Sequence, residues 1–432
     1  MRILVLGGYG LIGSAVVREC LARGLSVTGA GRNPDRGRRA IPGAEWVAAD
    51  LARLTRPEDW SGGLDGYDAV INCAGALQDG GGDDLWAVHH TGIAALLAAC
   101  EAAGVTRFVQ ISAPGADPDA TTTFMRTKAA GDAWVRESRL HWAILKPGLV
   151  ISPHAWGGSA LLRGLAALPY AIPVAHAAAP AQTVSVFELA REAADCATGQ
   201  RPSGYEADLV EDEAQTLAEM IGRIRDWLGF RRVPILPLPG WLAGLAGLAG
   251  DLAADLGWKT PLRSTAMRTM GAGVTGDASA WTAARGGPPS SLPQTLGEFE
   301  ADIQARRFAR TYFLHPLLIA GLSLFWIVSG VVAVFQRDAA ASILTAEGIA
   351  TSTALTLTLG GAALDIALGA GILIRRTSSL ALVGTITLTL AYAVSATVIT
   401  PHLWADPMGT LVKMLPIVLA ALAALAMNGS EK

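Results

Sequence analysis

Charged side chains are scarce in this sequence. They make up 16% of its 432 residues, against about 25% in an ordinary soluble protein. The shortage is concentrated between residues 314 and 428, where the charged residues are only Arg337, Asp338, Glu347, Asp365, Arg375, Arg376, Asp406 and Lys413. We therefore expect part of the chain to lie outside water. The net charge of -3 gives no reason to expect a nucleic-acid partner, because phosphates require a basic surface.

Cysteine and metal-binding motifs are equally sparse. Cys20, Cys73, Cys100 and Cys196 are scattered and form no CxxC pair, which predicts reduced thiols in a cytoplasmic domain. The sequence contains no HExxH motif, no zinc-type Cys/His cluster and no acidic calcium loop, so we predict no metal site. The histidines have no partners at ligand spacing, and no role is assigned to them.

The N-terminal apolar run is broken by glycines. Because these glycines interrupt the run and no small-residue cleavage site follows, we do not expect an export signal. RILVLG is instead typical of a buried strand, and SAVVRECLARG of a helix. The GxxGxxG spacing between them lets the backbone approach a pyrophosphate at the helix N-terminus. The predicted cofactor-binding residues here are Gly7, Gly10, Leu11, Ile12 and Gly13.

Strand and helix patterns alternate along the first third of the chain. Further strands are expected at 25–31, 44–50, 68–75, 106–113 and 141–148. This alternation predicts an α/β fold with a doubly wound parallel sheet over residues 1–150. Residues 151–305 are expected to form a smaller substrate-binding part, with a strand and helix at 183–196 and a helix at 211–229.

The choice between the two nicotinamide cofactors depends on the end of the second strand. An NAD-binding chain usually has an acidic residue there, whereas this one has Arg32, followed by further arginines in GRNPDRGRR. We therefore expect NADP(H) rather than NAD(H). Asp50 and Leu51, after the third strand, are candidates for contacting the adenine, and Ala74 and Gly75 end the fourth strand against the cofactor. Helix capping and turn formation are alternative roles for these positions.

Several motifs together resemble a known family over residues 1 to 300. They are GGYGLIG, the GRNPD turn, AADL, NCAG, the ISA that contains Ser112, Lys128, and KPG at 146–148, where relatives usually have RPG. The chain resembles the atypical, extended short-chain dehydrogenase/reductases, near the NmrA-like proteins and the nucleotide-binding accessory subunit of respiratory complex I. The resemblance implies a Rossmann fold and a nicotinamide cofactor.

The family's catalytic helix normally carries Tyr-x-x-x-Lys, in which the lysine lowers the pKa of the tyrosine that donates a proton. This chain has Phe124 in the tyrosine position, four residues before Lys128. The resemblance implies catalytic roles for Ser112 and Lys128, and Lys128 is also expected to bind the nicotinamide ribose. Thr122 and Thr123 lie nearby, but a threonine hydroxyl is too weak an acid to replace a phenol.

Three functions remain open from the sequence. The first is an NADP(H)-dependent reductase or isomerase that takes its proton from Lys128, water or the substrate. The second is a binding module that senses NADPH without much chemistry. The third is a nucleotide-sugar epimerase or dehydratase, which we rank last because that chemistry usually depends on the missing tyrosine.

A Gly/Ala/Leu-rich run occupies residues 233–258. It is too short before Asp251 to span a bilayer, which needs about 20 apolar residues. It could line a lipophilic pocket, lie against the membrane surface or form a buried helix.

Four longer apolar segments follow. They predict an all-α transmembrane domain over residues 306–432. The expected spans are 314–336, 351–374, 378–400 and 409–427. Arginines precede the first span and join the second to the third, so we expect both termini and the Rossmann domain on the cytoplasmic side of the cell membrane. The segment resembles the DoxX-like membrane domains. The expected partners are the lipid bilayer and a lipophilic, quinone-like small molecule.

Asp365 is the one carboxylate inside a predicted span. It lies about nine residues from the cytoplasmic end, or ~14 Å deep. An ionisable group at this depth is a functional candidate, and the alternative is a protonated side chain that packs between helices. Ser323, Thr385 and Thr387 lie at similar depth, whereas Lys413 enters from the opposite side.

Overall fold

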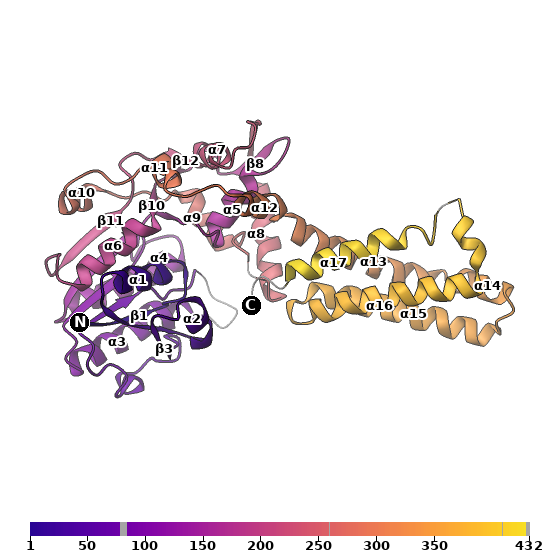
Figure 1. Ribbon diagram of the computed structural model, residues 1–432, viewed down its shortest axis with the longest axis horizontal. Coiled ribbons are helices and arrows are strands. Elements are labelled where there is room, and N and C mark those ends of the chain that lie inside the picture. Colours follow the sequence, from indigo (N-terminus) through magenta and orange to yellow (C-terminus); the bar gives the residue numbers. More distant parts are fainter. Residues whose placement is uncertain (78–83, 259, 408, 429–432) are drawn as a thin grey trace. The chain divides into compact units, whose positions relative to one another are not determined.

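The computed structural model describes residues 1–77, 84–258, 260–407 and 409–428, and the chain divides into two compact units. Unit 1 comprises Met1–Leu252 and Thr260–Ala309. Unit 2 comprises Ala253–Lys259 and Arg310–Lys432. Figure 1 shows unit 1 as a mixed helix and strand body and unit 2 as long helices.

Unit 1 is built on a seven-stranded parallel sheet in the order β11-β6-β5-β4-β1-β2-β3. The strands are β1 Arg2–Leu6, β2 Ser26–Gly31, β3 Glu45–Ala48, β4 Ala69–Asn72, β5 Arg107–Ile111, β6 His141–Pro147 and β11 Tyr205–Leu209. This confirms the predicted doubly wound sheet, and its first six strands lie where they were expected. The sequence analysis missed β11 because the acidic residues of YEADL make it unlike a buried strand.

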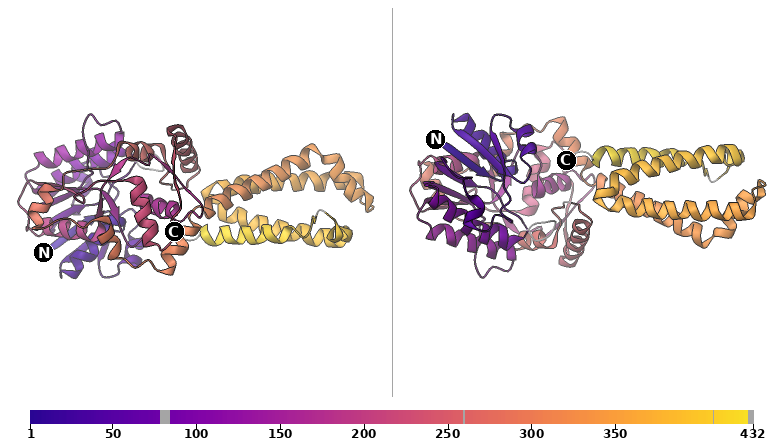
Figure 2. Two further views of the ribbon diagram at one scale, coloured as in Figure 1. Left: turned by 90° about the horizontal axis from the view of Figure 1, so that it is seen from above. Right: turned by 90° about the horizontal axis from the view of Figure 1, so that it is seen from below.

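Helices cover both faces of this sheet (Figures 1 and 2). In β1, Ile3 and Val5 belong to the core shared with α1 (Leu11–Ala22) and α6 (Val186–Ala197). Leu4 and Leu6 belong to the other core, with α3 (Gly92–Ala102). This alternation follows from the period of two in a strand. The remaining elements around the sheet are α2 (Pro34–Ala40), η1 (Pro57–Trp60), η2 (Ala87–Thr91) and α4 (Thr123–Glu137).

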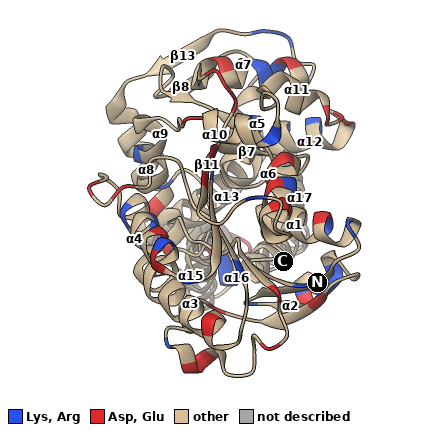
Figure 3. Cartoon of the chain, turned by 90° about the vertical axis from the view of Figure 1, so that its left-hand side faces the viewer, with Lys and Arg blue, Asp and Glu red and all other residues tan. Residues whose placement is uncertain are grey.

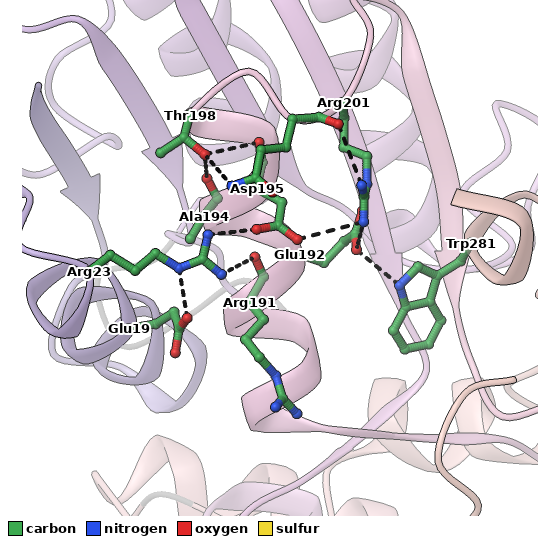
Figure 4. A network of polar contacts seen from close by, with 10 residues as sticks. Glu19, Arg23, Arg191, Glu192, Ala194, Asp195, Thr198, Arg201 and Trp281 are labelled. Atoms are coloured by element: carbon green, nitrogen blue, oxygen red, sulfur yellow. Dashed lines mark hydrogen bonds and ion pairs between the residues drawn. The ribbon is translucent and has the colours of Figure 1, made fainter. Parts of the chain in front are cut away.

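A network of charged side chains joins α1 to α6 (Figure 4). Arg23 donates to Asp195 over 2.6 Å and to Glu19 over 2.8 Å. Arg201 donates to the buried Glu192 over 2.6 Å, and the indole of Trp281 donates to the same carboxylate over 3.2 Å. Elsewhere on unit 1, Figure 3 shows both signs of charge on outer helices such as α4 and α6.

The smaller part of unit 1 has its own hydrophobic core. Residues of α5 (Gly157–Ala166), β8 (Ile172–Ala175), α7 (Leu217–Trp227) and α11 (Leu292–Gly297) form most of this core. The predicted helix at 211–229 begins six residues late, as α7, because Glu211 is buried and accepts hydrogen bonds from Thr183 and Leu292. Thr216 and Glu219 form a capping box at its start. The elements are β7 Leu149–Ile151, α5 Gly157–Ala166, β8 Ile172–Ala175, β9 Pro180–Ala181, β10 Thr183–Ser185, β12 Gln215–Thr216, α7 Leu217–Trp227, β13 Ile235–Leu238, α8 Gly240–Asp255, α9 Ser264–Ala272, α10 Ser279–Arg285, α11 Leu292–Gly297 and α12 Ile303–Thr311.

Unit 2 is helical: α13 Leu314–Phe335, α14 Arg337–Ala346, α15 Thr351–Leu373, α16 Arg375–Ile399, η3 Pro401–Ala405 and α17 Met414–Asn428. In the described ranges, three helices are long and apolar enough to cross a membrane, and they match the first three predicted spans. The fourth predicted span, 409–427, overlaps α17, which has only 15 residues. At 1.5 Å per residue α17 is ~22 Å long, short of the ~30 Å hydrocarbon core. Turns occupy the residues before it, where Thr410 donates to Asp406.

Candidate functional site

The turn between β1 and α1 has the geometry that the glycine spacing predicts. Gly7 adopts a left-handed φ of 68°, which favours glycine. A Cβ on Gly13 would lie 2.2 Å from the Gly7 carbonyl oxygen, so the helix can start this close to the strand only with glycine there. Gly10 precedes α1 without a side-chain cap. The first backbone amides of α1, including those of Leu11 and Ile12, can therefore hold an anionic group.

This turn lies where the strand order reverses, between β1 and β4, the usual binding place in an open α/β sheet. A Cβ on Gly7 would lie 2.9 Å from the backbone of Ala74, so the two loops touch. The Ala74 amide donates to the Asn72 side chain over 3.1 Å, and the buried Asn72 donates to Gln110 over 2.9 Å. These bonds fix the loop after β4 against the glycine turn.

Arg32, Asp50 and Leu51 lie beyond the adjoining strands β2 and β3. Arg32 is exposed directly after β2. The Asp50 carboxylate accepts from the Ala52 amide over 3.2 Å and pairs with Arg53 over 3.7 Å, which is the turn role that the sequence left open. The Leu51 side chain is buried in the core. Contacts of these three residues with a cofactor stay a prediction.

Lys128 is buried on α4, at the carboxyl end of the sheet. Its ammonium donates to the Ile111 carbonyl oxygen over 2.9 Å. A Cβ on Gly75 would lie 3.4 Å from Lys128 Nζ, so the structure brings these two candidate residues together. Burial lowers the pKa of Lys128, and the charge of Asp132 opposes this shift.

Ser112 does not stand free beside Lys128. Its hydroxyl donates to Asp132 Oδ2 over 2.5 Å. Burial raises the pKa of Asp132 to about 6, and the Ser112 hydrogen bond and the Lys128 charge oppose the rise. In the described part of the chain, Asp132 Oδ1 is buried without a hydrogen-bond partner. The sequence analysis missed Asp132, although it follows Lys128 by one helical turn and so shares its face.

His89 is the second residue that the sequence analysis missed. Its Nε2 accepts from the Ala76 amide over 3.1 Å, so Nδ1 carries the proton and donates to Thr127 Oγ1 over 3.0 Å. Burial lowers the pKa of His89 to about 2, and the charge of Lys128 adds to the shift. His89 is therefore a neutral part of the site wall and cannot supply a proton. The sequence around His89 gives no signal of this role, because its hydrogen-bond partners, Ala76 and Thr127, lie in other parts of the chain.

Phe124 stands at the position where the sequence resemblance leads us to expect a tyrosine. Its ring packs edge-on against His89, with 5.7 Å between ring centroids and 75° between planes. Neither nearby threonine replaces the phenol: Thr122 accepts from the Met125 amide as the cap of α4, and Thr123 accepts from Arg126. Lys128 is thus the remaining cationic acid among the residues that converge here.

Asp365, the predicted intramembrane candidate, lies in unit 2 and has its own polar neighbours. Ser329 Oγ donates to it over 3.2 Å and the Tyr392 hydroxyl over 3.1 Å. Ser323 donates instead to the Gly369 carbonyl oxygen. Asp365 therefore joins α13, α15 and α16 through two hydroxyl groups.

Comparisons with known proteins agree with both parts of this description. Residues 7–178 match a family described as NAD(P)H-binding, and residues 323–422 match the DoxX-like family. An NAD(P)H azoreductase of Xenophilus azovorans is 31% identical over 147 residues, which are 34% of this chain and 47% of that protein. The photosystem II assembly factor Ycf39 of Synechocystis is 30% identical over 149 residues, 34% of this chain and 44% of that one. The chain thus spans less than half the length of these relatives.

Two solved structures illustrate the fold. An NADPH-dependent quinone oxidoreductase from Escherichia coli is 16% identical, with a TM-score of 0.52 over 68% of this chain and 98% of that one. The Bordetella bronchiseptica enzyme WbmG in complex with NAD is 18% identical, with a TM-score of 0.51 over 69% and 92% of the two chains. At these identities the likeness shows the fold alone. The chain joins an NAD(P)H-binding Rossmann domain to a C-terminal DoxX-like helical domain.

Proposed function

We propose that this chain is a membrane-anchored, NADPH-dependent reductase of a lipophilic, quinone-like substrate, with Lys128 as its proton donor. The observation that carries the proposal is the buried Lys128 ammonium beside Gly75, at the point where the strand order reverses. A general acid works best when its pKa lies near the working pH. Burial moves the pKa of Lys128 in that direction.

The residues of the site fit a nicotinamide dinucleotide. Gly7, Gly10 and Gly13 leave room for a pyrophosphate, and Gly75 leaves room beside Lys128. A bound NADPH supplies a hydride. Lys128 positions the ribose and gives a proton to the reduced substrate oxygen, and Asp132 stabilises the lysine's charged form. Arg32, with Arg36 on α2, is the proposed contact for the 2'-phosphate that distinguishes NADPH from NADH.

The helical domain supports a lipophilic substrate, because anchoring in a bilayer raises the local concentration of membrane-soluble molecules. We place the Rossmann domain on the cytoplasmic side, since arginines gather at one end of the helices: Arg306, Arg307 and Arg310 before α13, and Arg375 and Arg376 at the start of α16. The resemblance to an azoreductase over part of the chain agrees with reductase chemistry. The nicotinamide pool that such an enzyme uses is cytosolic.

The test is single-turnover oxidation of NADPH bound to the purified full chain in detergent, mixed with quinones and lipophilic enones. We expect Lys128→Ala to slow oxidation by about 10²-fold or more, because general-acid groups contribute roughly 10² to 10⁴. Arg56→Ala is the control, because Arg56 is an exposed cation that pairs with Asp59 in η1, and its rate should stay at the wild-type value. An unchanged rate in Lys128→Ala would sink the mechanism.

A second candidate is an NADPH-binding module with little chemistry. It is favoured by one observation: Ser112, His89 and Lys128 all direct their hydrogen bonds to groups of the protein itself. Firm NADPH binding without oxidation by any acceptor of the panel would support it. The third candidate, a nucleotide-sugar epimerase, is disfavoured because Phe124 provides no phenol.

A further inference from the structure

Helix α8 turns its large apolar side chains outward. Trp241, Leu245, Leu248 and Leu252 are 65%, 53%, 63% and 63% exposed. Their spacing of four, three and four residues places them on one side of the helix. We call these four residues the α8 stripe. A buried Ala-rich helix, one of the three alternatives that the sequence left open for this run, does not agree with these exposures.

The opposite side of α8 is made of small residues that pack closely against residues 262–264 of the same unit. A Cβ on Gly250 would lie 2.5 Å from the Leu262 carbonyl oxygen, and one on Gly247 would lie 3.1 Å from Ser264 Cα. Asp251 accepts from the Ser264 amide and from Arg263, each over 3.3 Å. These contacts fix the rotation of the helix about its axis, so the stripe cannot turn inward without breaking them.

The C-terminal end of the same helix belongs to unit 2. The Arg375 amide, at the start of α16, donates to the Leu256 carbonyl oxygen over 2.9 Å. The Trp258 indole donates to the Leu373 carbonyl oxygen, at the end of α15, over 2.6 Å. The Arg375 guanidinium lies over the Trp258 ring, 5.2 Å from its centroid. Residues 253–258 are thus fixed at the junction of two helices that are long enough to span a membrane.

A junction between two spanning helices lies at the surface of the bilayer, where tryptophan and arginine are favoured. Leu252 precedes Leu256 by one helical turn, ~6 Å along the axis. Leu252, the last residue of the stripe, belongs to the same uninterrupted helix. Tryptophan at both ends of the segment, Trp241 and Trp258, suits the same environment.

We propose that the α8 stripe inserts into the surface of the bilayer that holds unit 2. The side chains of the stripe then lie among the upper acyl chains, and the small-residue side of the helix keeps its contacts with residues 262–264. This contact is an anchor for the nucleotide domain in addition to the spanning helices. It depends on the membrane location of unit 2 and not on the proposed reductase activity.

Spin-label accessibility tests this placement. Leu245→Cys and Leu248→Cys are made in a Cys73→Ser background, since the other three native cysteines are buried, and the labelled full chain is placed in phosphatidylcholine and phosphatidylglycerol nanodiscs. Val47→Cys is the matched control, because Val47 is an exposed apolar residue of β3 in unit 1. NADPH binding by each labelled protein reports that unit 1 is folded.

We expect labels at 245 and 248 to collide with oxygen, which dissolves in lipid, and to be shielded from a water-soluble nickel chelate. The oxygen-to-nickel ratio should exceed that of the Val47 control several-fold. Free collision with nickel at 245 and 248 would place the stripe in water and overturn the proposal. Exclusion of both reagents would show that protein covers it, such as a second copy of the chain, and would overturn the proposal equally.

Discussion

Two of the buried carboxylates, Asp132 in unit 1 and Asp365 in unit 2, have different surroundings. Asp132 in unit 1 lies one helical turn from Lys128, accepts from Ser112, and keeps Oδ1 without a partner among the described residues. Asp365 in unit 2 has one hydroxyl donor on each oxygen, Ser329 on one and Tyr392 on the other. A charged neighbour and an unused oxygen are typical of a site that handles protons. A carboxylate whose two oxygens are both hydrogen-bonded is typical of contacts that join helices.

This difference agrees with our proposal that unit 1 carries the chemistry and that unit 2 anchors the chain. In unit 1 the groups around Asp132 have shifted pKa values: lowered for Lys128, lowered to about 2 for His89, and raised to about 6 for Asp132 itself. Such shifts gather where burial and neighbouring charges act together. The predictions that follow test whether the contrast holds.

Restoring the missing phenol should have the largest effect. In Phe124→Tyr a phenol stands one turn from Lys128, against His89. We expect single-turnover reduction of a lipophilic enone by bound NADPH to rise by about 10²-fold, because a general acid contributes roughly 10² to 10⁴. The nicotinamide absorbance measures the rate.

Phe124→Leu is the control for this gain, since it alters packing against His89 without adding a hydroxyl. Its rate should not exceed that of the wild type. If Phe124→Tyr leaves the rate unchanged while NADPH still binds, a phenol at position 124 does not reach the substrate as a proton donor, and the prediction is wrong.

The second prediction concerns the pH dependence of stability. Asp132 titrates near pH 6 in the folded chain, against an ordinary value of 3.8, so the folded state holds a proton that the unfolded state has lost. Its contribution is present below pH 4 and is lost as the pH rises to 6, a difference of ~3 kcal/mol for about two pKa units. Asp132→Asn removes this loss. The free energy of unfolding of the variant, relative to wild type, should rise by that amount between pH 4 and 6.

His89 contributes to the pH dependence of stability with the opposite sign. Its pKa falls from 6.5 to about 2 on folding, so its contribution is present above pH 6.5 and is lost as the pH falls. Relative to wild type, His89→Gln should therefore gain stability toward acid pH. Chemical unfolding followed by intrinsic fluorescence at several pH values measures the free energy of unfolding of both variants.

If the free energies of unfolding of wild type and Asp132→Asn change with pH in parallel, Asp132 is solvated like an ordinary surface carboxylate.

The third prediction concerns the binding of NADPH to unit 1. Arg32→Ser is expected to weaken NADPH binding by about tenfold, or ~1.4 kcal/mol, and to leave NADH binding unchanged, since only NADPH carries the 2'-phosphate. Arg56→Ser is the control, because Arg56 is an exposed arginine that pairs with Asp59 in η1. Equal losses of affinity for NADPH and NADH would show that Arg32 does not contact the 2'-phosphate.

Much of the fold could be predicted from the sequence because its signals are local. Short apolar strands, the glycine turn and long apolar helices each depend on residues close together in the chain. The strand β11 escaped because Glu206 and Asp208 point to the edge of the sheet and pair with residues far away, such as Arg136 and the Asp277 amide. The fourth apolar helix was predicted to start too early, because hydrophobicity alone does not show that turns occupy residues 410–413.

The candidate site was predictable only where a motif fixed its residues. The structure brings the motif residues Gly75 and Lys128 together. The Ser112 hydroxyl donates to Asp132, and the catalytic role expected of Ser112 stays a prediction. His89 reaches the site because η2 packs against α4, where a Cβ on Gly131 would lie 2.0 Å from the His89 carbonyl oxygen. A helix crossing this close depends on the whole fold and leaves no local pattern around His89.

The smallest effect is expected at Asp365. If its hydroxyl bonds only join helices, a double-mutant cycle of Asp365→Asn and Tyr392→Phe should give a coupling energy of about 0.6 kcal/mol, and at most roughly 1.7 kcal/mol. Denaturation of the full chain in detergent measures it. Asp365→Asn combined with Thr387→Val should show no coupling, because Thr387 donates to Val383 on its own helix. Loss of reductase activity in Asp365→Asn at unchanged stability would instead give unit 2 a share in the chemistry, because a packing contact acts only through stability.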